Sequence, residues 1–368
     1  MGLLDYYRQF EGMSEEEFNQ GLREEAAERR RKALTRVETL DLSVTTWPQL
    51  PNPRIVSAIT FVARRGLHRY PPVSGGSDLR GRLAERHGVD PERLILGNGA
   101  AELLSTATRA LLEPGQQLLT RWPSYPLYPI MARRAHGRAV PVDGGVDQLL
   151  EAAGGEPDVR AVVIASPNDP TGELLTAAEL QRLLDGLPAG VAVLLDEALV
   201  EFVDAQPQSS SLELLERHPR LLVFRTFSKA WGLAGLRIGY AIGGPGSGEL
   251  LAQLAPDLDV SEISQAGAFE ALHSCSELIE RRTREVCEER LRVIAGLRER
   301  GFQVADSQAN FVWAAHPTLA GAELAARLSR TGVLIAAGDA LGEPRHVRIA
   351  IHSAPATDRL LGALDKAL

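Results

Sequence analysis

The chain has 368 residues, of which 44% are hydrophobic and 24% are charged, and these are ordinary values for a globular protein of roughly two domains. Its formal charge of −8 and its pI near 5.6 argue against nucleic acid as a partner. Its two cysteines are too few for a disulfide framework and match no zinc or redox motif. No apolar run reaches the ~20 residues of a membrane span, so we expect a cytoplasmic protein with no membrane partner and no bound metal.

The first elements in chain order are a helical arm and a series of strands. Residues 14–36 are rich in Glu and Arg with apolar residues at near-helical spacing, which predicts an exposed helix or an arm that clasps a second subunit. After the Pro-rich stretch 47–53, short apolar runs alternate with amphipathic segments of helical length. The runs cover residues 94–96, 162–164, 191–195, 221–224 and 238–242. This alternation predicts a largely parallel sheet between helices, with ligands at the carboxyl ends of its strands.

The pattern changes from about residue 261 onward. A long amphipathic helix is expected over 277–300, and a second one over 320–330, before a terminal helix. Strands are expected between and after them, at 302–304, 311–314, 333–336 and 347–351. We therefore predict an N-terminal arm (1–50), a large domain (51–262) and a small α+β domain (263–368).

Lysine is rare in this chain. Of the 40 basic residues only Lys32, Lys229 and Lys366 are lysines. Lys32 lies in a charged segment and Lys366 is two residues from the end, so both fit a solvated surface, whereas Lys229 lies between apolar segments. An amine can form an imine with an aldehyde and a guanidinium cannot, so Lys229 indicates chemistry, with a chance surface lysine as the alternative.

The glycine-rich segment 226–240 surrounds this lysine and follows a buried strand. The hydroxyls of Thr226 and Ser228 can donate to phosphate oxygens, and Arg237 can pair with them through two N–H groups. Such a turn would hold an aldehyde and its phosphate together. A plain glycine-rich connection between strands would explain the glycines but not the lysine.

Three weaker signals lie elsewhere in the chain. Asp196 ends an apolar run, where a carboxylate can pair with a protonated pyridine nitrogen, although an aspartate at a strand end is common without function. The turn before Ala100 and Ala101 is rich in small residues, so helix N-terminal amides can approach a phosphate there. Tyr125 can stack on a flat ring, although core packing is the commoner role of a tyrosine.

Together these residues resemble the fold type I pyridoxal 5′-phosphate (PLP) enzymes, and among them the class I/II aminotransferases of the histidinol-phosphate aminotransferase-like group. The resemblance runs from about Asp41 to the C-terminus, and its most specific part is the segment from Ser228 to Tyr240. Further matching segments occur in the family's order: Arg69-Tyr70-Pro71, Leu79-Arg80, Leu96-Gly97-Asn98-Gly99, Pro170-Thr171-Gly172, Asp196-Glu197-Ala198, Ser307-Gln308-Ala309-Asn310-Phe311 and Val347-Arg348-Ile349. The resemblance implies an α/β fold with a large, mostly parallel sheet between helices and a smaller α+β domain.

The resemblance also implies roles for single residues. Lys229 would form the imine with PLP and then move the substrate's α-proton, Asp196 would hold the pyridine nitrogen, and Tyr125 would stack on the ring. Arg348 would bind the carboxylate of the substrate, and Tyr70 would reach the phosphate in a neighbouring subunit, which requires a homodimer. The phosphate itself would be bound by Ala100, Ala101, Thr226, Ser228 and Arg237.

The sequence departs from the family at three positions. Asp169 stands where the family has an asparagine that donates to the ring hydroxyl of PLP, and an ionised carboxylate cannot donate there. Asp169 would have to be protonated, or turned away with Asn168 as the donor instead. Leu199 stands where a tyrosine is common, so we expect a shifted imine pKa. Ala336 stands where histidinol-phosphate enzymes have an arginine for the substrate phosphate, and losing such a contact costs ~1.5–3 kcal/mol.

These observations favour an aminotransferase that exchanges the amino group of a free α-amino acid with a 2-oxo acid, and disfavour histidinol phosphate. The alternative is another PLP reaction on an amino acid, such as decarboxylation, elimination or amine oxidation, because the site chooses which bond breaks. A PLP-sensing regulator would need a helix-turn-helix domain, for which the ~40 residues before the resemblance are too few. A non-catalytic nucleotide-binding protein is the remaining alternative. The segment Thr45-Thr46-Trp47 either contacts the substrate side chain or simply leads into the fold.

Overall fold

The protein is described from a computed structural model, which covers residues 20, 24, 39–70, 78–256 and 258–368. The chain divides into two compact units, Met1–Leu40 and Asp41–Leu368, and the description below concerns the second. The helix expected over 14–36 lies outside the described residues except for Gln20 and Glu24, and so does Pro71.

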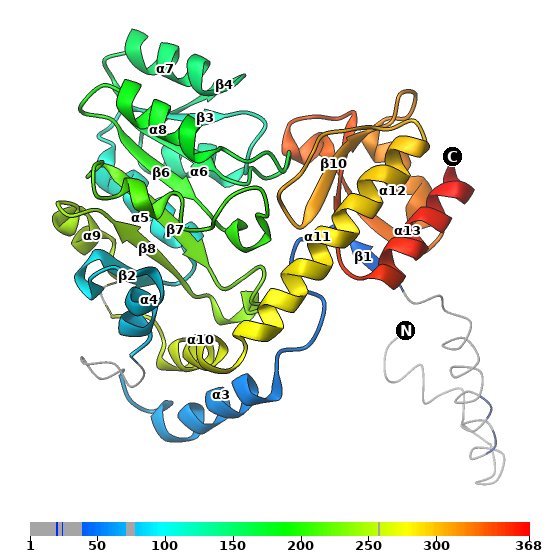
Figure 1. The fold of residues 1–368 in the computed structure, drawn as a ribbon, viewed down its shortest axis with the longest axis horizontal. Helices are drawn as coiled ribbons and strands as arrows, with labels where there is room; N and C mark the ends of the chain where they lie inside the picture. Colours follow the sequence, from blue (N-terminus) through cyan, green and yellow to red (C-terminus); the bar gives the residue numbers. More distant parts are fainter. Residues whose placement is uncertain (1–19, 21–23, 25–38, 71–77, 257) are drawn as a thin grey trace, which may run out of the picture. The chain divides into compact units, whose positions relative to one another are not determined.

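The larger sheet has seven strands in the order β2-β8-β7-β6-β5-β3-β4 (Figure 1). Its strands are β2 (Leu94–Gly97), β3 (Gln117–Arg121), β4 (Arg138–Val142), β5 (Val159–Ala165), β6 (Ala192–Asp196), β7 (Leu221–Thr226) and β8 (Gly239–Gly243). Every pair is parallel except the two that involve β8. The predicted, largely parallel sheet is therefore confirmed, and each apolar run named from the sequence lies in a strand or overlaps one.

The sequence did not predict β3 and β4. Strand β3 begins with Gln117 and ends with Arg121, and β4 is a half-exposed edge strand that contains Pro141. Proline has no N–H for the ladder of a sheet, but it is tolerated in an edge strand such as β4. Polar residues at both ends of β3 and half-exposure of β4 leave neither segment with the continuous apolar run that marks the other strands.

Helices cover both faces of this sheet because the parallel strands are joined by right-handed crossovers. The crossovers to β3 and β4 run in one direction along the sheet and those to β5 and β6 in the other, which places the first pair of helices on one face and the second pair on the opposite face. The first pair is α5 (Ala100–Leu111) and α6 (Leu127–Arg134), and the second is α7 (Val146–Gly155) and α8 (Ala177–Gly186). With α9 (Gly248–Leu254), α5 and α6 enclose a fully buried apolar core against the strands.

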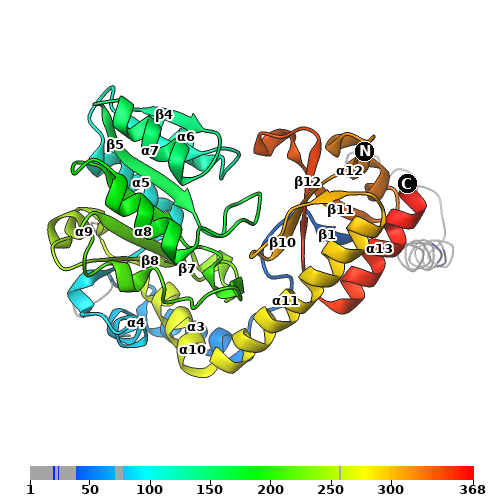
Figure 2. The same ribbon diagram turned by 45° about the horizontal axis from the view of Figure 1, so that its top comes forward.

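Three helices form a layer beside the large sheet. They are α3 (Pro53–Gly66), α4 (Leu79–His87) and α10 (Glu262–Ser274), and α10 packs against both of the others. Helix α11 (Ser276–Glu299) follows at once and leads to the smaller sheet (Figure 2). The division expected between residues 262 and 263 falls at the start of α10 and stays a prediction.

The smaller sheet has five strands in the order β1-β11-β12-β10-β9. They are β1 (Leu40–Leu42), β9 (Gln303–Val304), β10 (Phe311–Ala315), β11 (Val333–Ala337) and β12 (His346–Ala350), and α11, α12 (Gly321–Ser329) and α13 (Ala354–Ala367) accompany them. The pairs among β9 to β12 are antiparallel, so the predicted α+β arrangement is confirmed. No helix among the described residues is long and apolar enough to cross a membrane.

Candidate active site

A cavity of about 220 Å³ opens where the carboxyl ends of the central strands meet. Ala165 of β5 lies beside Asp196 of β6, which in turn lies beside Phe224 of β7, so the residues that follow these strands converge on one place. The cavity is lined by eleven of the residues singled out from the sequence: Thr46, Ala100, Ala101, Tyr125, Asp169, Asp196, Leu199, Thr226, Ser228, Lys229 and Arg237. Asn168, Tyr70 and Arg348 do not line it.

One end of the cavity is suited to a phosphate. Helix α5 begins at Ala100 without a side-chain cap, and because the Gly99 carbonyl accepts from the amides of Glu102 and Leu103, the amides of Ala100 and Ala101 are the ones available to a ligand. Gly99 before it has φ +96°, and a Cβ there would lie 2.6 Å from Nη2 of Arg237. The guanidinium therefore lies against the start of α5, where only a glycine leaves it room.

Two hydroxyls lie at this same end. Oγ1 of Thr226, at the end of β7, donates to Oγ of Ser228 at 3.0 Å and accepts from the Ser228 amide at 3.1 Å. The short 3₁₀ turn Ala234–Leu236 then brings Arg237 back toward them, in a left-handed conformation with φ 48°. Amides, hydroxyls and a guanidinium together form a donor set suited to a dianion.

Asp196 marks another end of the cavity, where its carboxylate is buried. Oδ2 accepts a hydrogen bond from the Tyr128 hydroxyl at 2.9 Å and Oδ1 one from the Ala198 amide at 3.0 Å. Burial raises the pKa of Asp196 to about 6, against the lowering effect of these two hydrogen bonds and of Lys229. The carboxylate is thus costly to ionise until a cation faces it.

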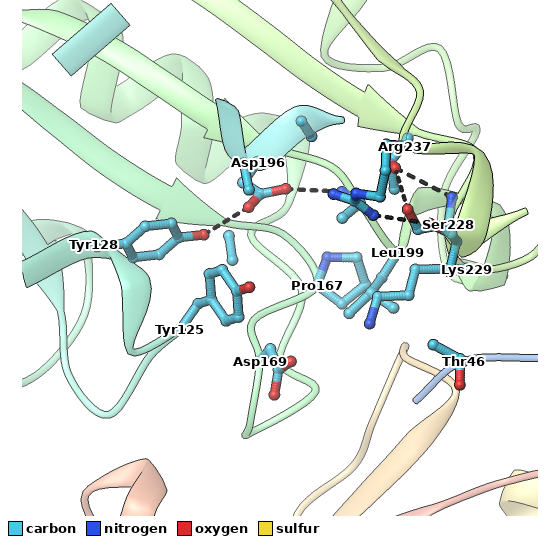
Figure 3. A pocket seen from close by; sticks show the side chains of 16 residues that line it. Thr46, Tyr125, Tyr128, Pro167, Asp169, Asp196, Leu199, Ser228, Lys229 and Arg237 are labelled. Atoms are coloured by element: carbon cyan, nitrogen blue, oxygen red, sulfur yellow. Dashed lines mark hydrogen bonds between the residues drawn. The ribbon is translucent and has the colours of Figure 1, made fainter. Parts of the chain in front are cut away.

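Two tyrosines form the wall on one side (Figure 3). The ring of Tyr125 lies edge-on to that of Tyr128, with 5.6 Å between centroids, and one of its faces is free to contact a flat group in the cavity. Burial, followed by the charges of Asp196 and Asp169, raises the pKa of Tyr125. Its hydroxyl therefore stays protonated.

Lys229 lies on the side opposite these tyrosines (Figure 3). Its Nζ donates to Oγ1 of Thr45 at 2.5 Å. Burial lowers the pKa of the amine, although Asp169 acts in the other direction. Desolvation therefore makes the neutral, nucleophilic amine more accessible than on an exposed lysine.

The segment 43–47 is fixed over this amine by several side chains. Asn310 donates to the carbonyl of Thr45 at 3.0 Å, and the guanidinium of Arg282 lies 4.7 Å from the ring centroid of Trp47. Of the three residues that were expected either to contact the substrate side chain or to lead into the fold, Thr46 lines the cavity, whereas Thr45 holds Lys229 and Trp47 packs on Arg282.

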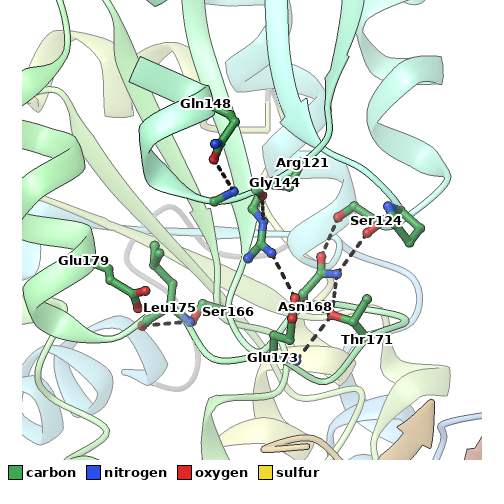
Figure 4. Close-up of polar contacts among 12 residues, drawn as sticks. Arg121, Ser124, Gly144, Gln148, Ser166, Asn168, Thr171, Glu173, Leu175 and Glu179 are labelled. Carbon is green, nitrogen blue, oxygen red and sulfur yellow. Dashed lines mark hydrogen bonds and ion pairs between the residues drawn. The ribbon is translucent and has the colours of Figure 1, made fainter. Parts of the chain in front are cut away.

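The structure gives Asp169 a partner that the sequence did not suggest. Its Oδ1 lies 2.6 Å from Nη1 of Arg348, the arginine expected to bind a substrate carboxylate. Asn168 does not take over as a donor into the cavity, because its amide group donates to the Pro123 carbonyl at 3.0 Å and to Oγ1 of Thr171 at 2.9 Å (Figure 4). Asp169 lines the cavity but is turned toward an arginine.

Tyr70 stands apart from all of these residues. Its side chain is 82% exposed and lies outside the cavity of its own chain. Its expected role in a neighbouring subunit stays a prediction.

Comparison with known proteins identifies the family. Residues 37–364 match the family described as aminotransferase class I and II. The chain belongs to this family. The aromatic amino acid aminotransferase of Corynebacterium efficiens is 37% identical over 326 residues, which are 85% of this chain and 89% of that protein. Histidinol-phosphate aminotransferase 1 of Cupriavidus pinatubonensis is 36% identical over 308 residues, which are 82% and 81% of the two chains.

Solved structures agree with this assignment. The histidinol-phosphate aminotransferase of Sinorhizobium meliloti, solved in complex with PLP, superposes with a TM-score of 0.79 at 27% identity and covers 93% of both chains. The protein is thus a PLP-dependent aminotransferase with the fold type I architecture, as the resemblance implied.

The cavity of this aminotransferase fits PLP on structural grounds. The amides of α5 with Thr226, Ser228 and Arg237 suit the phosphate, and the absence of a Cβ at Gly99 leaves room for the Arg237 guanidinium at this end. The buried carboxylate of Asp196 suits a protonated ring nitrogen, because a facing cation offsets the cost of ionising it. Lys229 is an amine in the same cavity.

One residue and one pairing of the site escaped the sequence analysis. Tyr128 supports Asp196 but lies in an amphipathic helix, where its spacing indicates only core packing. Thr45 was named from the sequence, but its pairing with Lys229, 184 positions away, follows from no local pattern. Tyr128 follows Tyr125 by three residues across the turn that starts α6, and this short separation was the available signal.

Proposed function

We propose that this aminotransferase moves the amino group of a free α-amino acid with an aromatic side chain to a 2-oxo acid, with Lys229 as the residue that attaches PLP. The observation that carries the proposal is the placement of one buried amine and one buried carboxylate, those of Lys229 and Asp196, in a single cavity beside a phosphate-binding helix start. The aromatic side chain is suggested by relatives named aromatic amino acid aminotransferase.

When bound, PLP withdraws electrons from the substrate carbon, so that its proton can be removed. Asp196 would favour this by keeping the ring nitrogen protonated, with Tyr128 and the Ala198 amide holding the carboxylate in place. Tyr125 would pack on the ring. The donors at the start of α5, Thr226, Ser228 and Arg237 would fix the phosphate.

Lys229 would then carry the substrate proton. Its neutral amine, favoured by burial, can accept the proton of the substrate's α-carbon and then donate it to another atom in the cavity. The hydrogen bond to Thr45 keeps Nζ at a fixed place in the cavity.

The surroundings of Arg348 support a carboxylate substrate over a phosphorylated one. Ala336 of β11 pairs directly with Arg348 of β12, so the position where histidinol-phosphate enzymes have a second arginine is beside Arg348 and carries no charge. A phosphate dianion would find only Arg348 there and would lack the second cation, whereas one arginine is enough to bind a carboxylate.

The active protein is proposed to be a cytoplasmic homodimer. Helix α3 and the residues after it carry large exposed apolar side chains: Val56, Phe61, Leu67 and Tyr70. A second copy of the chain would cover them and bring Tyr70 toward the partner's phosphate. Cys275 and Cys287 are both free thiols, which suits a reducing compartment.

A single-turnover experiment tests the function. The PLP-loaded protein, mixed anaerobically with phenylalanine or tyrosine and no acceptor, should release about one 2-oxo acid per subunit and then stop until a 2-oxo acid is added. Continued release of ammonia or carbon dioxide without an acceptor would instead support the alternative reactions. Lys229→Ala should abolish turnover and change the visible spectrum of the bound cofactor, and an unchanged spectrum would contradict the role of Lys229.

A further inference from the structure

The ion pair between Asp169 and Arg348 joins the two sheets of the protein. Asp169 lies in the loop after β5 of the large sheet, and Arg348 lies on β12 of the small one. The 2.6 Å contact is sheltered, since each side chain is only 14% exposed. A pair with this burial is far less screened than a surface ion pair, so it is a substantial interaction in the resting protein.

The loop that carries Asp169 is fixed independently of the ion pair. The Asn168 side chain is held by Ser124, Pro123 and Thr171 (Figure 4). Gly172 has φ +77°, and a Cβ there would lie 2.2 Å from Oγ of Ser307. The loop therefore packs closely on the segment between β9 and β10 of the small sheet. Asp169 is therefore held facing Arg348 by its surroundings.

Arg348 has limited freedom to serve two carboxylates. Its Nη2 donates to the Ser43 carbonyl at 3.3 Å, and its guanidinium lies 5.5 Å from the ring centroid of Phe311. Its cross-strand neighbours are Trp313 and Ala336, neither of which is charged. One cation thus faces one internal anion at the place proposed for the substrate carboxylate.

We propose that Asp169 is a specificity-determining residue that competes with the substrate's α-carboxylate for Arg348. This inference rests on the proposed role of Arg348 as the substrate's carboxylate partner. A carboxylate that enters must take over the N–H groups now given to Asp169, because two anions at one guanidinium repel each other. Ligands whose only contribution is a carboxylate are therefore bound poorly, and a substrate must gain affinity through its side chain and its amine.

A displaced Asp169 would still have a basic nitrogen near it. Lys229 lines the same cavity as Asp169, and the charge of Asp169 acts to raise the pKa of the Lys229 amine against the lowering effect of burial. A displaced Asp169 would therefore favour the protonated form of this nitrogen, and the resulting counter-charge keeps the displacement feasible.

The test measures binding of matched ligands to the PLP-loaded protein by calorimetry. The first pair is 3-phenylpropionate and its uncharged amide 3-phenylpropanamide, neither of which has an amine to react. The second pair is acetate and acetamide, which are small enough to enter the cavity whichever substrate side chain it prefers. The proteins are wild type, Asp169→Asn, Arg348→Gln and Asp306→Asn, the last being the same change in a surface ion pair with Arg298, where Asp306 is 92% exposed.

Asp169→Asn should bind both carboxylates about tenfold more tightly than wild type and both amides equally well. Arg348→Gln should lose the preference for carboxylates, and Asp306→Asn should behave as wild type. Equal carboxylate binding by wild type and Asp169→Asn, including no detectable binding by either, would overturn the proposal. Tight acetate but absent 3-phenylpropionate binding by Asp169→Asn would count against the aromatic substrate and leave the competition by Asp169 supported.

Discussion

Asp196 combines a buried carboxylate with a role that needs it ionised. Burial raises its pKa from 3.8 to about 6. Because the folded pKa lies above the unfolded one, the protonated side chain favours folding below pH 3.8, and this stability is lost as the pH rises through about 6. In the cofactor-free protein at neutral pH, the ionised carboxylate therefore weakens the fold.

Asp196→Asn should stabilise the cofactor-free protein at pH 7.5 by about 2 kcal/mol, since it removes the buried charge and keeps a hydrogen-bonding group of the same shape. The gain should shrink as the pH falls from about 6 toward 3.8. Urea unfolding of both proteins over this range measures it. The same variant should bind PLP more weakly. A gain in the free energy of unfolding that does not change with pH would show that the charge of Asp196 is not the cause.

The residues of this site differ in how far the sequence could predict them. Asp196 comes directly after one apolar run and Thr226 and Ser228 follow another within a few residues, and polar residues at the ends of parallel strands converge by geometry. The partner of Asp169 could not be found this way, because Arg348 is 179 positions away on the other sheet. The sequence indicated that Asp169 was unusual, and only the tertiary structure supplied the cation beside it.

At the scale of elements, the start of α5 depends on Gly99. Gly99→Ala introduces a Cβ at φ +96° and places it 2.6 Å from Nη2 of Arg237, so the guanidinium must move away from the phosphate end. We expect about tenfold weaker PLP binding, with a loss of roughly 1 kcal/mol in the free energy of unfolding.

Gly88→Ala is the matched control for this change. Gly88 ends α4 in the left-handed region with φ +65°, and no atom lies within 4 Å of a Cβ built there. It should lose similar stability but keep its PLP affinity, as measured by cofactor titration and urea unfolding. Equal PLP affinity in the two variants would show that the space beside Arg237 is not needed.

The segment 43–47 is a second element that contacts the proposed catalytic lysine, through Thr45. Thr45→Val keeps the shape of the side chain and removes the acceptor for Nζ of Lys229. We expect kcat to fall about fivefold, because one hydrogen bond between neutral groups is worth ~1 kcal/mol, while PLP affinity stays near wild type. Thr46→Val, in a residue that lines the cavity beside it, should leave kcat within about twofold of wild type. A normal kcat in Thr45→Val would remove this residue from the positioning of Lys229.

For the whole molecule too, the sequence predicted features that depend on neighbouring residues and missed those that depend on residues far apart in the chain. Continuous apolar runs were sufficient to predict β5 to β7, which are buried on both faces, and a period of 3.6 was sufficient for α11, which buries one face. The edge strand β4 was missed because half of it faces water, and the order of the strands depends on crossovers that no single segment specifies. Helix α3 differs from these elements, because its apolar residues Val56 and Phe61 are exposed.

This outward surface gives the last prediction. Phe61 on α3 is 58% exposed, and Leu67, Tyr70 and Leu258 are also exposed. If a second copy covers them, Phe61→Glu buries a charge in the interface and should convert the dimer to a monomer in light-scattering measurements. The specific activity of this monomer should then be far below that of wild type, because Tyr70 no longer reaches the partner's cofactor. Leu291→Glu, which adds the same charge at a 64% exposed leucine of α11, should stay dimeric and active. A Phe61→Glu protein that is dimeric and fully active would exclude α3 from the interface.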